Sequence, residues 1–173
     1  FVDGICAYAM FGYFKAESGW YINMLLYNFC AFALQMPFGF AIDLLETKKP
    51  DKKYITYFVT FVGVMLTMLG VWTHPVVLGI GNALFHIGGG IHTIRRDLAL
   101  NQKGRLLGIF VAPGALGLFL GKKLGVGAYV SKTAMMLFMA MLLIVLLGLL
   151  FLGYSKENLG RESDALKKRG IDL

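Results

Sequence analysis

The chain has 173 residues, of which 57% are hydrophobic and only 16% are charged. About a quarter of the residues in an ordinary soluble domain are charged, so this composition excludes that class and predicts a protein of the lipid bilayer. A net charge of +7 would suggest nucleic acid as a partner of a soluble domain. Here the basic residues lie in the breaks between apolar stretches, so we expect the bilayer and no nucleic acid as a partner.

Six apolar stretches follow one another along the chain, each long enough or nearly long enough for the roughly 20 residues of a membrane-spanning helix. They predict an all-α polytopic membrane protein with six transmembrane helices, at residues 2–14, 20–43, 54–73, 75–94, 105–127 and 132–154. We expect residues 1–154 to form one bundle and residues 155–173 to form a cytoplasmic polar tail or linker. The first stretch is short and begins at Phe1, so we also expect further residues upstream.

The Lys and Arg residues are concentrated in every second break and in the tail. Thirteen of them fall there: Lys48, Lys49, Lys52, Lys53, Arg95, Arg96, Lys103, Arg105, Lys156, Arg161, Lys167, Lys168 and Arg169. The alternate breaks hold only four: Lys15, Lys122, Lys123 and Lys132. Because loops rich in Lys and Arg stay on the cytoplasmic side, the pattern predicts a cytoplasmic C-terminus. The short connection Thr73-His74-Pro75 predicts that the two helices it joins are antiparallel neighbours.

The stretches differ in polarity. Residues 54–73 and 132–154 have no ionisable or amide side chain in their interiors, so we expect these two helices to face lipid and the other four to face one another or a cavity. The inward set carries the candidate substrate or proton pathway: Asp3, Asn28, Gln35, Asn82 and His86.

Helical rise places three of these polar groups at one depth. Asp3 lies about 18 Å from Lys15, His86 about 16 Å from Pro75, and Gln35 about 21 Å from Tyr21, at about 1.5 Å per residue. All three therefore fall near the middle of a core about 30 Å thick.

Asp3 and His86 allow two interpretations. They can pair across two helices as part of a proton or substrate relay, because an imidazole beside an intramembrane carboxyl can hold or exchange its proton near neutral pH. Alternatively, His86 completes a structural hydrogen-bond network and Asp3 lies near a frayed end. Asn82 and His86, four residues apart, share a helix face, and so do Asn28 and Gln35, seven apart.

Helix breakers and small residues are frequent in several stretches, and they indicate either close helix packing or hinges. The candidates are Pro37, Gly39, Gly89, Pro113, Gly114, Gly117 and Gly121. Breakers in corresponding helices of two three-helix units are typical of an inverted repeat.

The sequence shows no enzyme signature. It has no nucleophile elbow, no phosphate-binding loop before a helix and no paired metal-ligand spacing, so we expect no catalytic residue, metal or cofactor. Cys6 and Cys30 lie inside predicted spans and are interpreted as packing residues.

Three segments resemble the major facilitator superfamily of secondary transporters, in its N-terminal six-helix half. They are Phe1-Val2-Asp3; Gln35 to Asp43 followed by Lys48 and Lys49; and Gly81-Asn82-Ala83-Leu84-Phe85-His86, continuing through Arg95-Arg96 to the segment Phe110 to Gly117 and to Gly121. The third resembles bacterial drug-efflux members of the fosmidomycin-resistance type.

The resemblance implies a 3+3 inverted-repeat half bundle in a bacterial inner membrane. The expected activity is secondary transport of a small solute by alternating access, possible only with a second six-helix half, from a homodimer or a separate domain. It also implies a conformational latch at Asp43, with Arg95 and Arg96. The alternative is a non-transporting membrane subunit that scaffolds a partner complex.

Overall fold

The computed structural model describes residues 2–48, 54–127, 130–145 and 147–148, and no strand occurs among them. Four helical stretches are long and apolar enough to cross a membrane: Trp20–Glu46, Ile55–Trp72, Pro75–Ala99 and Arg105–Gly127. The chain is therefore all-helical with the composition of an integral membrane protein, and four of the six expected spans meet the length criterion. Contacts divide it into two units, 1–135 and 136–173, and the features described below lie in the first.

Helix α1, Val2–Gly12, is followed by a 3₁₀ turn, Phe14–Ala16. With 11 residues, α1 spans about 16 Å, roughly half of a bilayer core. Its side chains are nevertheless buried almost throughout, including Asp3, Cys6 and Met10. It is therefore a central packing element of the unit despite its length.

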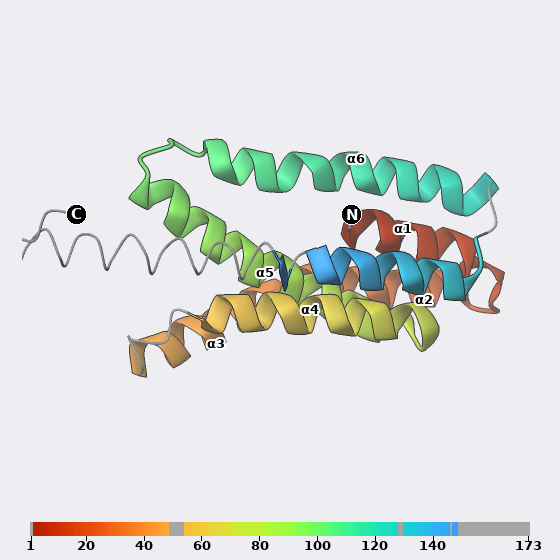
Figure 1. Ribbon diagram of the computed structural model, residues 1–173. Helices are drawn as coiled ribbons and strands as arrows, with labels where there is room; N and C mark the ends of the chain where they lie inside the picture. The colour runs from red at the N-terminus through yellow and green to blue at the C-terminus, as the bar shows by residue number, and fades with distance from the viewer. Residues whose placement is uncertain (1, 49–53, 128–129, 146, 149–173) are drawn as a thin grey trace, which may run out of the picture. The chain divides into compact units, whose positions relative to one another are not determined.

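The second stretch is one long helix, Trp20–Glu46, with an irregular centre; Figure 1 labels its two parts. It comprises α2, Trp20–Asn28, the π-helical segment η2, Phe29–Ala33, and α3, Gln35–Lys48. The π segment lies just before Pro37, whose nitrogen cannot donate to the carbonyl four residues earlier. The irregularity that Pro37 and Gly39 predicted is therefore located one turn ahead of them.

Helices α4, Ile55–Trp72, and α5, Pro75–Ala99, are antiparallel neighbours that pack along much of their length, as the short connection predicted. His74 caps α5, because its Nδ1 accepts from Val76 N at 3.2 Å and Pro75 occupies the first helical position. The two backbones approach closely where side chains are smallest. A Cβ on Gly63 would lie 2.8 Å from Phe85 Cα, and one on Gly81 would lie 2.7 Å from Thr67 Oγ1.

Helix α6, Arg105–Gly127, continues unbroken through Pro113 and packs lengthwise on α1. A Cβ on Gly4 would lie 3.1 Å from Gly117 O, and one on Gly12 would lie 3.3 Å from Gly125 O. Of the two interpretations of these small residues, close packing is the one observed here, because the α6 glycines let α1 approach.

The buried carboxyl of Asp97 fixes the turn between α5 and α6. It accepts from Gly104 N at 2.6 Å and from Leu106 N at 2.8 Å, and thus satisfies donors at the start of α6 that have no partner within the helix. Gly104, at φ +88°, adopts the left-handed conformation that glycine tolerates without strain.

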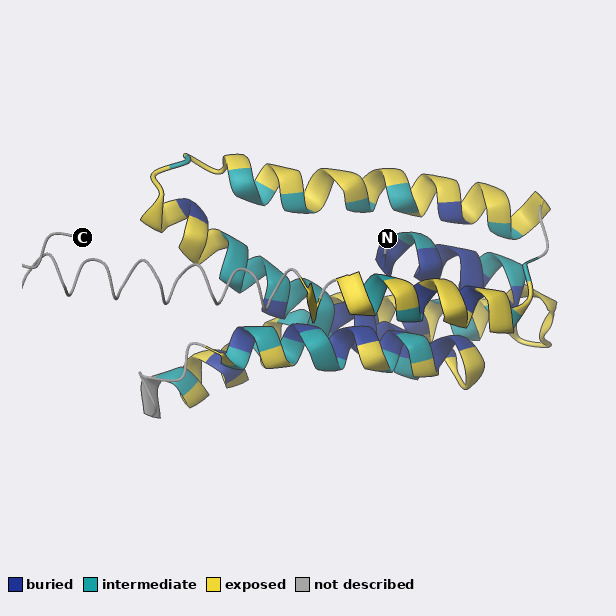
Figure 2. Ribbon diagram, viewed as in Figure 1, coloured by how far each residue is buried: buried dark blue, intermediate teal, exposed yellow. Residues whose placement is uncertain are grey.

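The expected division into inner and outer helices was wrong for α4. Seven of its residues are buried, whereas Gly121 is the single buried residue of α6, and Figure 2 shows α6 largely exposed. The reason is that α4 has a face of glycine and threonine. The hydroxyls of Thr60 and Thr67 donate hydrogen bonds to the carbonyl oxygens of Thr56 and Gly63, four residues earlier. Because these hydroxyls have partners within the helix, they can be buried in a close helix contact.

The sixth predicted span is helical over Lys132–Val145 and shorter than a membrane span there. Its remaining residues, apart from 147–148, and the predicted tail 155–173 lie outside the described residues.

Candidate functional site: a buried polar network

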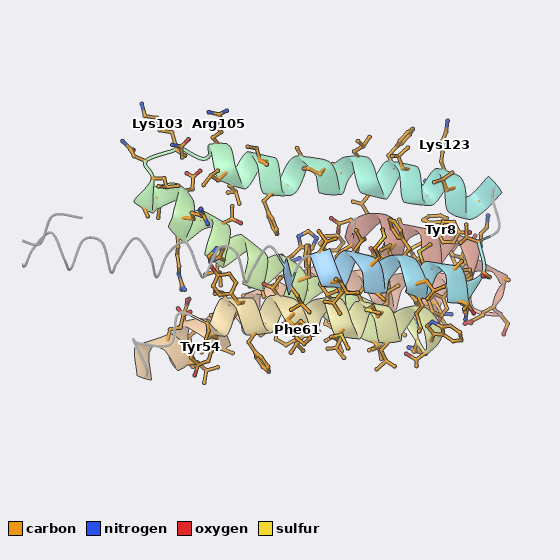
Figure 3. The ribbon with its side chains drawn as sticks, viewed as in Figure 1. Tyr8, Tyr54, Phe61, Lys103, Arg105 and Lys123 are labelled. Atoms are coloured by element: carbon orange, nitrogen blue, oxygen red, sulfur yellow. The ribbon has the colours of Figure 1, made fainter. Side chains whose placement is uncertain are left out.

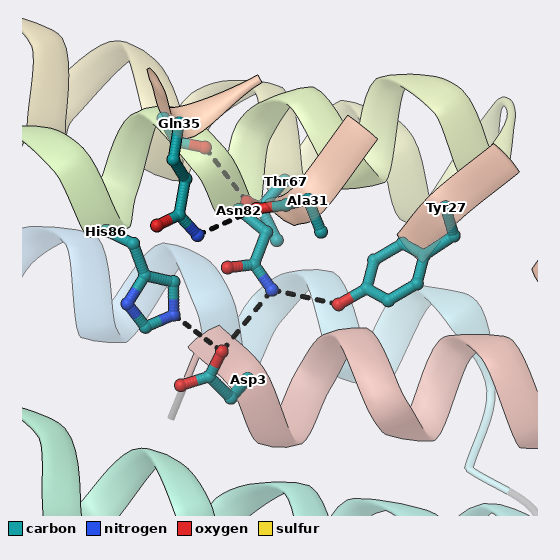
Figure 4. A network of polar contacts seen from close by, with 8 residues as sticks. Asp3, Tyr27, Ala31, Gln35, Thr67, Asn82 and His86 are labelled. Carbon is teal, nitrogen blue, oxygen red and sulfur yellow. Dashed lines mark hydrogen bonds and ion pairs between the residues drawn. The ribbon is translucent and has the colours of Figure 1, made fainter. Parts of the chain in front are cut away.

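A network of side chains joins α1, α2 and α5 in the interior of the first unit (Figure 4). His86 Nε2 lies 2.7 Å from Asp3 Oδ1, and Asn82 Nδ2 donates to the same oxygen at 3.3 Å. Asn82 Nδ2 also donates to the Tyr27 hydroxyl at 2.8 Å. The pairing of Asp3 with His86, predicted from depth alone, is present; its role as a relay stays a prediction.

Each member is positioned by the local structure of its helix. Asn82 and His86 are one turn apart on α5 and face α1 together. The carboxyl of Asp3 has room to reach them because α6 has no side chain opposite it: a Cβ on Gly114 of α6 would overlap Asp3 Oδ2. The glycine-lined contact between α1 and α6 therefore makes room for the carboxylate.

The carboxylate needs these partners because burying a charge without hydrogen bonds is very costly. Asp3 Oδ1 accepts two, from Asn82 and His86, so one oxygen is well satisfied. The network is not sealed, because the side chain of Asp3 is 11% exposed and that of His86 is 25% exposed. Both side chains therefore keep some contact with their surroundings.

Tyr27 is a member that the sequence reasoning missed, and Asn28 was named in its place. Tyr27 is buried, whereas Asn28 is exposed. The π-helical segment Phe29–Ala33 explains the difference, since an i→i+5 turn adds about one residue to the helical register. Residues eight apart then share a face, which aligns Tyr27, rather than Asn28, with Gln35.

Gln35 lies on the same side of the helix without joining the network directly. Its Nε2 donates to Ala31 O at 2.8 Å, and its side chain is partly exposed. Figure 4 shows its amide group turned to Ala31, with no dashed line to His86 or Asn82.

Two aromatic rings border His86. The Phe85 centroid lies 5.4 Å and the Phe110 centroid 6.1 Å from that of the imidazole, and the two phenyl rings are 5.9 Å apart. Phe110 comes from α6 and lies over Gly89, where a Cβ would come within 2.8 Å of the ring. Gly89 is thus a close-packing residue.

In the predicted latch cluster, Arg95 interacts electrostatically with both Asp43 and Glu46. Arg95 of α5 forms a two-point ion pair with Glu46 of α3, Nη1 to Oε1 at 2.8 Å and Nη2 to Oε2. Asp43 and Arg96 are exposed on the same two helices. Figure 3 shows Lys103 and Arg105 near the beginning of α6 and Lys123 near its other end. Glu46 could have been recognised because it is three residues from Asp43 and shares its face.

Both cysteines are buried and free, as the packing interpretation predicted. Among the described residues, no group of three or more His, Cys, Asp or Glu side chains could hold a metal ion.

Comparison with protein-family models, with curated proteins and with solved structures found no match to this chain.

Proposed function

We propose that this protein is a half-transporter that carries a small solute across a membrane by alternating access, together with a second six-helix half. The observation that carries the proposal is the network of Asp3, Asn82, His86 and Tyr27. Ionisable side chains inside a membrane are costly and are found where ions, protons or substrates pass. A purely structural bundle could place apolar residues at all four positions.

Proton coupling is part of the proposal. An imidazole in direct contact with a carboxylate can take up a proton when a cavity opens to one side of the membrane and release it on the other. The partial exposure of both side chains supports this role.

The need for a second half comes from the mechanism. Alternating access requires two bundles that rock about a site near the midplane, and this chain contributes one. The exposed apolar face of α6, with Leu116, Phe119 and Leu124 among its residues, supports contact with a second bundle or with lipid. The distribution of basic residues supports a C-terminus in the cytoplasm. On the resemblance to secondary transporters we further propose a bacterial inner membrane and a cytoplasmic latch at Asp43, Arg95 and Arg96.

The test is uptake into proteoliposomes with an imposed proton gradient, using a panel of labelled sugars, amino acids, amines and organic acids. At least one solute should accumulate in a gradient-dependent way, and Asp3→Asn should abolish its accumulation. Glu17→Gln serves as the matched control, because Glu17 is an exposed carboxylate that bonds Asn23 outside the network. Unchanged uptake and unchanged pH dependence in Asp3→Asn would refute the proposal.

A non-transporting scaffold subunit is the alternative. The same exposed face of α6 would then bind a permanent partner. Mass measurement in detergent separates the two: a half-transporter that works as a homodimer gives a dimer, whereas a stable monomer that transports nothing favours the scaffold.

A further inference from the structure

The hydrogen-bond donors and acceptors of the network differ in how many are already bonded within the protein. Asn82 uses both hydrogens of its amide nitrogen, one toward Asp3 and one toward Tyr27. Gln35 uses one of its amide hydrogens on Ala31 O. Both amide hydrogens of Asn82 and one of the two of Gln35 are therefore already bound within the protein.

An acceptor remains. Asp3 Oδ1 takes both hydrogen bonds that reach this carboxylate from the described residues, while Oδ2 lies against the bare backbone of Gly114 on α6. A ligand that binds here has to bring hydrogen-bond donors.

The charge of Asp3 and the aromatic rings beside it further restrict the chemical class of ligand that can bind. Among the described residues, the two side chains that bond Asp3 are Asn82 and His86, and neither is Lys or Arg, so the carboxylate of Asp3 is the source of negative charge at the site. The rings of Phe85 and Phe110, 5.9 Å apart beside that charge, are apolar and present faces that attract cations.

We propose that the site binds a small organic cation that carries N–H donors, namely a protonated amine with an apolar body. The ammonium donates to Asp3 Oδ2, and the apolar body lies against Phe85 and Phe110. An organic anion is repelled by Asp3, and a neutral polyol finds too few free donors for its own oxygens. This inference names the substrate class of the proposed transport site and therefore rests on the proposed function.

The test is equilibrium binding by calorimetry to the protein in lipid nanodiscs, with three ligands of similar size: 2-phenylethylammonium, neutral 2-phenylethanol and anionic 3-phenylpropanoate. The ammonium should bind at least tenfold more tightly than either of the others. Asp3→Asn should weaken its binding at least tenfold, whereas Glu17→Gln should leave it unchanged.

A second variant tests the inference in case the first one does not fold. If Asp3→Asn does not fold, Phe110→Leu removes the ring and keeps an apolar side chain, and it should weaken ammonium binding severalfold without improving that of the alcohol. Equal affinity for the three ligands, full ammonium binding by Asp3→Asn or Phe110→Leu, or no ammonium binding by the wild type would overturn the inference.

The two proposals fail separately. Ammonium binding without transport of any solute would refute the half-transporter and leave the cation site standing. Gradient-driven uptake of a sugar or an organic acid, with no ammonium binding, would do the reverse.

Discussion

Replacing Gly121 by alanine should separate α6 from α1. A Cβ at this position would lie 2.8 Å from the backbone carbon of Gly4 and 3.0 Å from its Cα. Carbon atoms in comfortable contact are about 3.5–4.0 Å apart, so the helices would have to move apart by on the order of 0.5–1 Å. The obstacle is backbone, which cannot rotate away as a side chain can.

The size of the effect follows from a matched pair on the same helix. Overpacking of this kind costs about 1–3 kcal/mol, while glycine to alanine in a helix gains about 1 kcal/mol. Gly108→Ala has the same gain without the clash, because nothing lies within 4 Å of its Cβ position. The free energy of unfolding of Gly121→Ala should therefore be lower than that of Gly108→Ala by about 1–3 kcal/mol.

The assay is unfolding of both variants by sodium dodecyl sulfate in dodecylmaltoside micelles, followed by circular dichroism. Equal midpoints for Gly121→Ala and Gly108→Ala would refute the close contact of α1 with α6. A midpoint of Gly108→Ala far below the wild type would refute the assignment of that position to open space.

Two further substitutions test connections at the ends of α6. Asp97→Ala removes the acceptor of Gly104 N and Leu106 N and should lower the free energy of unfolding by about 1–2 kcal/mol. The same titration with sodium dodecyl sulfate measures this effect, and an unchanged free energy would contradict the role of Asp97 as a cap. Tyr13→Phe removes the hydroxyl that donates to Val130 O at 2.5 Å and should cost about 0.5–1.5 kcal/mol, so a variant as stable as the wild type would argue against this bond.

Much of the helical framework could be predicted because apolar length and polar breaks determine it. The Asp3–His86 contact was also predictable, since two rare polar groups at one depth in a bilayer have few other partners. The cap formed by Asp97 was not, because an acidic residue among basic ones at a helix end gives no sign of which backbone donors it will accept.

Two other features depended on information that periodicity does not contain. Tyr27 replaces Asn28 in the network because a π-helical segment shifts the register, and a shift of one residue cannot be read from the apolar pattern. Helix α4 is buried because its threonines satisfy their own hydroxyls, so a helix without ionisable groups packs inside as readily as against lipid.

Gly114→Ala should weaken ligand binding without lowering the free energy of unfolding. The added Cβ would meet Asp3 Oδ2 and lie 3.5 Å from Cγ, so it displaces the end of a side chain and leaves the backbones of α1 and α6 in place. The helix-propensity gain of about 1 kcal/mol should keep the free energy of unfolding within about 1 kcal/mol of the wild type. The displaced carboxylate, however, loses its short contact with His86, and Oδ2 is covered by the new methyl group. Binding of 2-phenylethylammonium should therefore fall at least tenfold in a protein that unfolds at a near wild-type midpoint. Gly108→Ala is the control, because it has the same gain in helix propensity and should keep wild-type binding. Wild-type binding by Gly114→Ala would mean that Asp3 Oδ2 is not the atom that receives the cation.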